Sequence, residues 1–417
     1  MNKEVVIIGG GISGLFASCI CAKRGFNTTV LSYGQGALAV AGGIIDVLGY
    51  DAHGKLVEDP LAAIAKLPQT HPYSKIGTAN IEAALKAFVA LAKDAHYPYK
   101  GDAHHNQMVP TGIGSFKPTC LTPPSIAGNL IPQAERLVVL GFRGLKDYFA
   151  DLVCENLRRN LPKNSCEILS AEITLNFDCE GDCRDLNALD IARKLDTHVG
   201  YLNFREQLKN YVKGKTVFIL PPVLSATPTT DLLDLLDIEI NAKFIEVSAI
   251  PPSVTGYRTE LMLKNMATKL GVEIIEKAHV IGASVHDGHC TSVMTQGCDR
   301  LRTYEADHFI LASGGVFGNG LVTAMGRMYE PIFNIEIEVP KNQQQWSHQY
   351  LFTGKPQPFA TYGIETDDKL RPLQHGQVLL DNVHVVGRAL SGYDFCFEKS
   401  GNGVAICSAY HAASILE

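Results

Sequence analysis

VVIIGGGISGLFASCICA, residues 5–22, is an uncharged run near the start of the chain, and its glycines decide the fold. About 18 apolar residues is the lower limit for crossing a bilayer. Each glycine in a helix interior costs roughly 1 kcal/mol relative to alanine, however, and the first ten residues of this run hold four of them. A signal peptide needs a basic start, whereas Lys3 is offset by Glu4. We therefore expect neither a membrane anchor nor a signal peptide.

The same run fits the start of a nucleotide-binding fold. An apolar strand is predicted over residues 5–8 and a helix over 13–23, and GxGxxG joins them. Gly9 permits the tight turn, Gly11 lets backbone N–H groups approach a phosphate, and Gly14 lets the helix pack on the strand. The phosphate would then lie at the positive end of the helix dipole.

Composition narrows the class of protein. A chain of 417 residues is long enough for two or three domains. Its net charge of −6 and the lack of a basic stripe argue against a nucleic-acid partner. The cysteines number eleven and form no CxxC pair, which favours structural thiols in a reducing compartment over disulfides or an iron–sulfur cluster. Cys179 and Cys183 could share a helical face, but no second pair lies nearby in the sequence.

Later segments indicate a discontinuous domain. DHFILASGGVFGNG (307–320) and DNVHVVGRALSGYD (381–394) each predict a strand running into a glycine turn, and a terminal helix follows. Strands from both ends of the chain would build one sheet. The expected fold class is α/β, a Rossmann-like domain with an inserted α/β cap. The expected division is 1–50 with 256–417 for the first domain and 51–255 for the cap.

Four segments together resemble the flavoprotein superfamily of succinate dehydrogenase and fumarate reductase. They are the GxGxxG motif, ALAVAGGIID (37–46), ILASGGVFG (310–318) and VHVVG (383–387). The resemblance implies a flavin-binding fold whose A-Q-G-G loop is matched here by Ala41, Gly42 and Gly43, and whose late A-T-G-G turn is matched by Ser313, Gly314 and Gly315. Gly387-Arg388 stands where many members have Gly-Asp or Gly-Glu, a carboxylate that contacts the ribityl chain.

A closer resemblance covers nearly the whole chain. The segments HPYS (71–74), PPSVTGYR (251–258), EPIF (330–333), YGIETDDKLRP (362–372) and GRALSGYDFCFEKSGNGVAICSAYHAA (387–413) are similar to the subunit designated B in the anaerobic glycerol-3-phosphate dehydrogenases. This implies a flavin subunit that works with a larger flavoprotein subunit and a membrane-bound iron–sulfur subunit. Together they would oxidise sn-glycerol 3-phosphate to dihydroxyacetone phosphate and reduce quinone. The chain would be cytoplasmic, without a membrane span of its own, and held at the inner face of the cell membrane by its partners.

The end of the second strand bears on the cofactor. A strand is predicted over NTTVLS, residues 27–32. A dinucleotide site usually has Asp or Glu at that strand's end, where it binds the adenosine ribose. Here the residue is Ser32. Because a mononucleotide has no adenosine ribose, we expect FMN, the cofactor that the resemblance also implies. FAD is the alternative, since a serine hydroxyl can also bond a ribose.

The start of the terminal helix, at Gly401, Asn402 and Gly403, is a further candidate for binding the cofactor. A helix that begins near Gly403 would direct free N–H groups at an anion, and a reduced flavin is negative near N1 and the C2 carbonyl. The alternative is an Asn402 N-cap before an ordinary core helix.

Oxidation of a secondary alcohol needs a hydride acceptor, a base and, for this substrate, a cationic clamp on the phosphate. The flavin would accept the hydride. Arg258, Arg327 and Arg371 are candidate clamps, because guanidinium binds phosphate bidentately, although each could form a structural ion pair instead. His71 and His384 are candidate bases. Their alternatives are a turn-stabilising role for His71 and a core position for His384.

Asp102, His104 and His105 raise the possibility of a metal site, but adjacent histidines seldom point to one ion, so no metal is expected. Two other functions stay open. The chain could be a flavin oxidoreductase for another small hydroxy acid. It could also be an assembly or electron-relay subunit whose larger partner oxidises the substrate, which the lack of an evident His–Arg pair and the departure at Arg388 favour.

Overall fold

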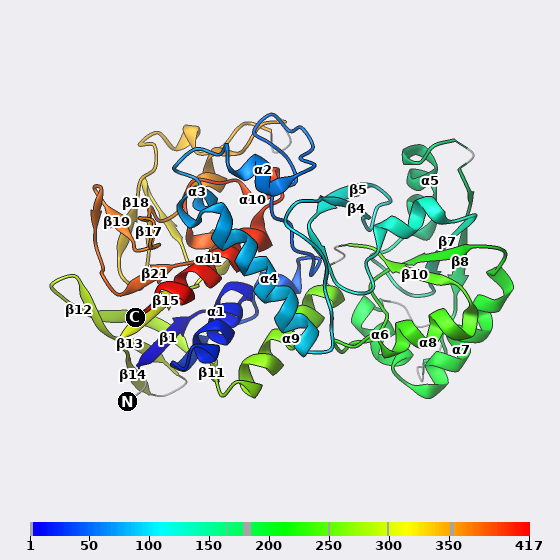
Figure 1. Cartoon of the computed structure of the whole chain (residues 1–417), viewed down its shortest axis with the longest axis horizontal. Helices are drawn as coiled ribbons and strands as arrows, with labels where there is room; N and C mark the ends of the chain where they lie inside the picture. The colour runs from blue at the N-terminus through cyan, green and yellow to red at the C-terminus, as the bar shows by residue number, and fades with distance from the viewer. Residues whose placement is uncertain (1–2, 164, 178–184, 249–250, 298–299, 351–353) are drawn as a thin grey trace.

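The structure is a computed structural model that describes residues 3–163, 165–177, 185–248, 251–297, 300–350 and 354–417 (Figure 1). Two α/β units lie side by side, each with its own parallel sheet and hydrophobic core (Figure 1). Both chain ends belong to the larger unit, and the smaller one is inserted between them. Cys179 and Cys183 lie outside the described residues.

The larger unit has a five-stranded sheet with strands from both ends of the chain. In spatial order these are β11 (Glu273–Glu276), β2 (Asn27–Ser32), β1 (Glu4–Ile8), β15 (His308–Leu311) and β21 (Val383–Val385). Every pairing between neighbours is parallel, so the carboxyl ends of the strands meet at one edge. The predicted Rossmann-like α/β fold is confirmed.

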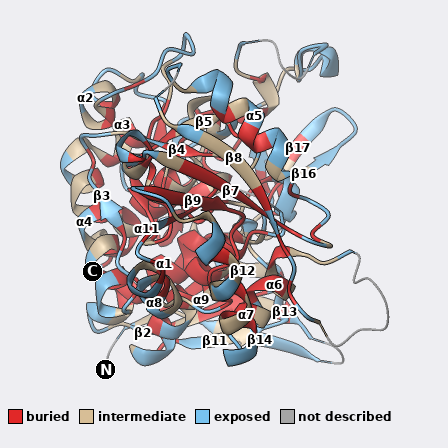
Figure 2. Cartoon of the chain, turned by 90° about the vertical axis from the view of Figure 1, so that its right-hand side faces the viewer, coloured by how far each residue is buried: buried red, intermediate tan, exposed pale blue. Residues whose placement is uncertain are grey.

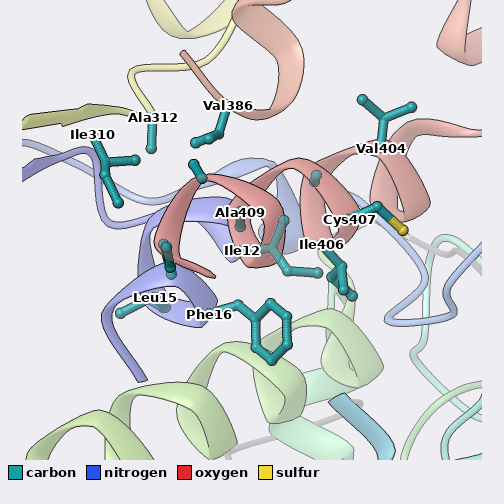
Figure 3. Close-up of a cluster of buried hydrophobic side chains, with 14 of the residues drawn as sticks. Ile12, Leu15, Phe16, Ile310, Ala312, Val386, Val404, Ile406, Cys407 and Ala409 are labelled. Carbon is teal, nitrogen blue, oxygen red and sulfur yellow. The ribbon is translucent and has the colours of Figure 1, made fainter. Parts of the chain in front are cut away.

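Two apolar helices pack against this sheet and against each other. They are α1 (Ile12–Lys23) and α11 (Gly401–Ile415), both buried over most of their length. Figure 3 shows Ile12, Leu15 and Phe16 of α1 in one cluster with Ile406 and Ala409 of α11. A helix that is apolar on all sides is stable only where it is buried, so both helices lie in the core of the larger unit.

The smaller unit has a four-stranded parallel sheet. Its spatial order is β10 (Lys243–Glu246), β9 (Thr216–Leu220), β7 (Arg136–Phe142) and β8 (Glu167–Ile173). Its helices are α5 (Ala150–Asn160), α6 (Ala188–Leu195), α7 (His198–Leu208) and α8 (Asp231–Ile240). Figure 2 shows β7 and β9 in red, buried inside the unit, as expected for a parallel sheet covered on both faces.

The two cores divide the chain differently from the expected boundaries. The core of the smaller unit begins at Ile131 and ends at Val254. The helix α4 (Thr78–Asp94) and the later Leu121 belong to the larger core. The reason is that α4 packs on α11, a helix of the larger core. The inserted unit therefore starts well after residue 51.

The remaining elements surround these two units. The short helices are α2 (Pro60–Ile64), α3 (Pro72–Ile76) and α10 (Phe395–Glu398), and α9 (Val254–Lys269) connects the units. Antiparallel pieces are β3 (Lys100–Gly101) with β6 (Leu121–Thr122), β4 (Gln107–Pro110) with β5 (Phe116–Thr119), β12 (His279–His286) with β13 (His289–Gln296) and β14 (Leu301–Glu305), β16 (Val322–Ala324) with β17 (Arg327–Glu330) and β18 (Ile335–Ile337), and β19 (Leu373–Gln374) with β20 (Gln377–Val378). Within the described ranges no helix combines the length and apolarity needed to cross a membrane.

Replacing Gly14 by alanine is expected to destabilise the protein by about 1–3 kcal/mol, the range for overpacked cores. A Cβ at this position would lie 1.8 Å from the carbonyl oxygen of Gly9, a backbone atom that cannot rotate away. Gly34→Ala is the matched control, because a Cβ there meets nothing within 4 Å. Urea unfolding followed by circular dichroism measures both. Equal midpoints for the two variants would contradict the packing role of Gly14.

Candidate functional site

The glycine motif lies at the carboxyl edge of the five-stranded sheet, between β1 and α1. Gly9 has a φ of +120°, and a Cβ on it would lie 2.2 Å from the carbonyl oxygen of Ala312. Gly14 permits the contact with Gly9 described above. A Cβ on Gly11 would find its nearest neighbour, Gly36 Cα, only at 3.9 Å. As the sequence predicts, Gly9 makes the tight turn and Gly14 allows the close packing of the helix. Gly11 has open space beside it.

The first turn of α1 offers free donors. Its N-cap is Gly11, and among the described residues no side chain caps the helix. The first N–H groups of a helix have no partner inside the helix and form the positive end of its dipole. Such an end binds phosphate well.

The turn after β15 meets the same edge. Gly314 has a φ of +83°, and a Cβ there would meet nothing within 4 Å. The Oγ of Ser313 is buried and has no hydrogen-bond partner in the part of the chain that the structure describes. A Cβ on Gly315 would lie 2.8 Å from Cγ of Arg388. This turn therefore offers a polar atom and an open backbone face next to a cation.

The Arg388 guanidinium is held by aromatic rings and one carbonyl. It lies 4.3 Å from the ring centre of Phe395 and 5.4 Å from that of Tyr393, and its Nη2 donates to the carbonyl of Ala360 at 2.8 Å. Its Nη1 is buried, with no acceptor among the described residues. The neighbouring Gly387, with a φ of +70°, approaches α1 so closely that a Cβ would lie 2.3 Å from Ser13 Oγ.

The loop of Ala41, Gly42 and Gly43 is bound to the start of α9. Thr255 Oγ1 donates to the carbonyl of Gly42 at 2.8 Å. Gly43 has a φ of +64°, and a Cβ on it would lie 2.5 Å from the carbonyl oxygen of Thr255. A Cβ on Gly256 would lie 2.5 Å from the carbonyl oxygen of Ala41. The loop is thereby fixed close to α9.

Ser32 is buried at the end of β2. A Cβ on Gly10 would lie 2.3 Å from its Oγ, so the hydroxyl packs directly on the glycine turn. Its Oγ also donates to the carbonyl of Gly34 at 3.3 Å. Ser32 is therefore in contact with the glycine motif.

The terminal helix α11 begins at Gly401 with Ser400 as N-cap, and no described side chain caps it. Asn402 lies inside the first turn, where its Nδ2 donates to the carbonyl of Ile44 at 2.8 Å. The alternative of an Asn402 N-cap is therefore wrong, because that side chain faces the preceding loop. The N–H of Gly403 donates to the carbonyl of Asp46 at 2.9 Å.

Arg258 does not have the surroundings of a phosphate clamp. It is 1% exposed, and its Nη1 and Nη2 lie 2.6 and 2.9 Å from the two carboxylate oxygens of Glu246. Its Nε donates to the carbonyl of Ser225 at 2.7 Å. Burial by itself would lower the pKa of Arg258, but the charge of Glu246 outweighs it and raises the pKa. Arg258 therefore forms the structural ion pair that was its alternative, and it joins α9 to β10.

The other candidate arginines differ in exposure. Arg371 pairs with Asp367 at 2.8 Å, which is again a structural role. Arg327 is exposed on β17, with its guanidinium 4.7 Å from the ring centre of Tyr329.

Both candidate histidines are engaged within the chain. His71 is 2% exposed; its Nδ1 accepts the N–H of Tyr73 at 3.1 Å and so caps α3, and its Nε2 lies 3.2 Å from Glu398 Oε2. Its turn-stabilising alternative therefore holds. His384 is buried in β21, where Nδ1 lies 2.8 Å from the carbonyl of Lys369. Burial lowers the pKa of His384 to about 4.

The polar cluster near residue 104 is divided between separate partners. His105 lies 3.0 Å from Asp102, whereas His104 lies 3.6 Å from Asp59. Within the described residues, no group of three or more His, Cys, Asp or Glu side chains is arranged to hold a metal ion.

One ion pair at the site was missed by the sequence analysis. Lys117 of β5 places its Nζ 2.5 Å from Oδ2 of Asp46, in the loop that follows Gly43. Asp46 closes the quoted segment ALAVAGGIID, so its place beside the cofactor loop was a usable signal. Nothing in the sequence around Lys117 indicates that it reaches this loop.

A protein-family match and two relatives show the family to which this chain belongs. The family described as FAD binding domain matches residues 4–404. Two proteins named as the subunit designated B of anaerobic glycerol-3-phosphate dehydrogenase, from Vibrio vulnificus (strain CMCP6) and Vibrio cholerae serotype O1 (strain ATCC 39315 / El Tor Inaba N16961), are 32% and 31% identical to this chain. The matches cover 99% of this chain and 95% and 96% of those proteins. Among solved structures, 3-ketosteroid delta1-dehydrogenase from Sterolibacterium denitrificans is 9% identical, covering 99% of both chains, with a TM-score of 0.48.

Removal of Glu246 is expected to destabilise the protein strongly. Glu246→Ala leaves the Arg258 guanidinium buried without its counter-ion, which costs about 3–5 kcal/mol of unfolding free energy. The double variant Glu246→Leu/Arg258→Met should recover only part of the loss, because both charges are gone but the Leu224 N–H and the Ser225 carbonyl lose their buried partners. Glu276→Ala is the control, since Glu276 is 66% exposed in its pair with Lys264 and should cost under about 1 kcal/mol. Comparable losses in both single variants would contradict the burial argument.

His384 should make stability depend on pH. The folded chain keeps it neutral down to a pKa of about 4, while the unfolded chain binds a proton below about 6.5. The free energy of unfolding should therefore fall as pH drops from 6.5 to 4, by up to about 1.4 kcal/mol per pH unit. His384→Asn should lose this contribution, and the exposed control His286→Asn should keep it. Identical pH profiles for wild type and His384→Asn would refute the assignment.

Proposed function

Because this chain belongs to the family of the subunit designated B in anaerobic glycerol-3-phosphate dehydrogenase, within the FAD-binding flavoproteins, we propose that it is the flavin subunit of a respiratory dehydrogenase. The complex would oxidise sn-glycerol 3-phosphate to dihydroxyacetone phosphate and pass the electrons to quinone. Its partners would be a larger flavoprotein subunit and a membrane-bound iron–sulfur subunit. These would hold the chain at the cytoplasmic, inner face of the cell membrane.

The observation that carries the proposal is the meeting of uncapped donors at the carboxyl edge of the five-stranded sheet. Among the described residues, neither α1 nor α11 has a side-chain cap. The buried Ser313 Oγ and Arg388 Nη1, which lack partners within the described ranges, lie beside the turns at the same edge. A flavin nucleotide carries phosphate, ribityl hydroxyls and a polar ring, so these donors fit its chemistry. When bound, the flavin supplies a two-electron acceptor.

We propose FAD as the cofactor, in place of the FMN expected from the sequence. The family that spans residues 4–404 is described as FAD-binding. The physical support lies at Ser32, which is buried against the glycine turn and keeps a hydroxyl at the position of the ribose ligand. The absence of an acidic residue in the sequence at the end of β2 is therefore compatible with FAD, because a hydroxyl can take its place.

Arg327 is the remaining candidate for a substrate-binding cation in this proposal. The residue is exposed, its guanidinium lies 4.7 Å from the ring centre of Tyr329, and a guanidinium can bind phosphate bidentately. Arg258, Arg371 and His71 are taken up by partners within the chain.

The same engagement favours a second candidate function. A chain whose buried histidine and arginines serve the fold could carry electrons or support assembly, while the larger subunit oxidises the substrate. A flavin oxidoreductase for another small hydroxy acid would instead need a clamp such as Arg327 for a carboxylate.

The test begins with the purified chain, alone and co-purified with the larger subunit. We expect the absorbance spectrum of a flavin, and FAD on acid release and mass measurement. Activity with glycerol 3-phosphate and an artificial acceptor then separates the candidates. An active isolated chain supports direct catalysis, and an inert flavin-loaded chain with an active complex supports the relay role. A colourless chain that cannot be reconstituted would overturn the flavin proposal.

Gly11→Glu is expected to reduce the bound flavin to under about a tenth of the wild-type amount, because a carboxylate placed at the start of α1 repels phosphate. The open space around Gly11 should let the flavin-free variant unfold at nearly the wild-type temperature. Flavin content per protein and thermal unfolding of both flavin-free proteins are the measurements. An unchanged flavin content would show that phosphate does not bind at this helix start.

A further inference from the structure

Asp46 and Lys117 form an ion pair for which the proposed function has no role so far. The Lys117 Nζ lies 2.5 Å from Asp46 Oδ2, and the two side chains are 22% and 13% exposed. A charge that is largely removed from water needs a partner of opposite sign. Lys117 and Asp46 are such partners, and their contact uses only one carboxylate oxygen, Oδ2.

The backbone of Asp46 is fixed to the start of α11. Its carbonyl accepts the N–H of Gly403 at 2.9 Å. A Cβ on Gly403 would lie 2.5 Å from the same carbonyl oxygen, so glycine is needed for this approach. Two further bonds tie the loop down, from Asn402 Nδ2 to the carbonyl of Ile44 at 2.8 Å and from the Tyr73 hydroxyl to the carbonyl of Val47 at 2.8 Å. Asp46 therefore lies between the Gly42–Gly43 loop and the start of α11, and both segments are candidates for binding the cofactor.

Lys117 reaches the pair from the other side. It belongs to β5, in the segment that leads toward the inserted unit. The next residue, Pro118, packs on the same loop, since a Cβ on Gly49 would lie 2.8 Å from its Cγ. The lysine is thus held against Asp46 by a strand that is separate from both candidate cofactor segments.

The second carboxylate oxygen of Asp46 is the unexplained atom. Oδ1 is buried and accepts no hydrogen bond from any described residue. A buried carboxylate oxygen without a donor is unfavourable, so a donor outside this chain is expected at this point. An oxidised flavin ring has one N–H group, at N3, and N3 is bonded to the C2 carbonyl carbon. The start of α11 is suited to face that carbonyl, because the N–H groups of Gly401 and Asn402, unlike that of Gly403, have no partner among the described residues.

We propose that Asp46 Oδ1 accepts the N3–H of the bound flavin, and that Lys117 is a positioning residue that holds Asp46 and balances its charge. The proposal rests on the proposed flavin site. It also predicts how each charge acts on the reduced ring, which is negative at this end. Asp46 disfavours reduction and Lys117 favours it, and in the wild type the two effects largely cancel.

The first experiment compares FAD with 3-methyl-FAD, which lacks the N3–H. Flavin-free Asp46→Ala should bind FAD about 10- to 100-fold more weakly than the wild type, the loss for a hydrogen bond to a charged group. It should bind 3-methyl-FAD no more weakly than the wild type does. Asp46→Asn keeps an acceptor oxygen and should fall between them; it also serves if the alanine variant does not fold. Equal losses for both flavins, or no loss for either, would overturn the contact.

The second experiment measures the midpoint potential of the flavin-loaded protein. Asp46→Asn should raise it, Lys117→Met should lower it, and the double variant should return close to the wild type. A merely structural pair would not give shifts of opposite sign, so shifts in the same direction or none would refute the assignment. The control is the surface pair of Lys23 and Asp94, 3.7 Å apart and 39% and 60% exposed, whose variants Lys23→Met and Asp94→Asn should leave the potential unchanged.

These outcomes are distinct from a failure of the proposed function. If the wild-type chain binds no flavin, both proposals fail together. If it binds FAD and the Asp46 and Lys117 variants behave as the wild type does, only the assignment of this pair fails.

Discussion

The close approach of backbone segments at the carboxyl edge of one parallel sheet is the constraint on which the rest of the structure depends. Gly9 and Gly14 bring the first strand and α1 together, with no room for a Cβ at either position. Gly387 brings the turn after β21 against α1 in the same way. Because the strands are parallel, the turns after them gather at one edge, and the helix starts that follow present their donors there. The candidate cofactor site is formed where these turns and helix starts meet.

Buried charge is used in this molecule mainly to join segments. The Arg258–Glu246 pair is almost fully removed from solvent and links α9 to the sheet of the inserted unit. A buried pair of this kind is weak support for overall stability, but loss of one partner is costly, so it fixes how the two units meet. The Asp46–Lys117 pair differs because one of its oxygens has no donor among the described residues. That difference separates a pair that completes the fold from one that is suited to a ligand.

The sequence by itself determined the fold class and the glycine turns of the candidate nucleotide site. The GxGxxG motif and the two late strand-to-glycine turns are patterns of consecutive residues, at 5–22, 307–320 and 381–394. Such a pattern predicts the same local structure however the rest of the chain folds. The boundary of the inserted unit could not be found in this way, because α4 joins the larger core through contacts with α11, more than three hundred residues later.

Only the tertiary structure decided what the individual charged residues do. A guanidinium such as that of Arg258 can serve in a phosphate clamp or in an ion pair. Glu246, on strand β10 of the inserted unit, decides between these roles. His71 contacts Glu398, which lies 327 residues away in the sequence, and Asp46 contacts Lys117, which lies 71 residues away. The physical reason is that a motif is held by the backbone geometry of consecutive residues, whereas the task of a charged side chain depends on its partners and on its exposure to water. Partners and exposure are set only when distant segments pack together.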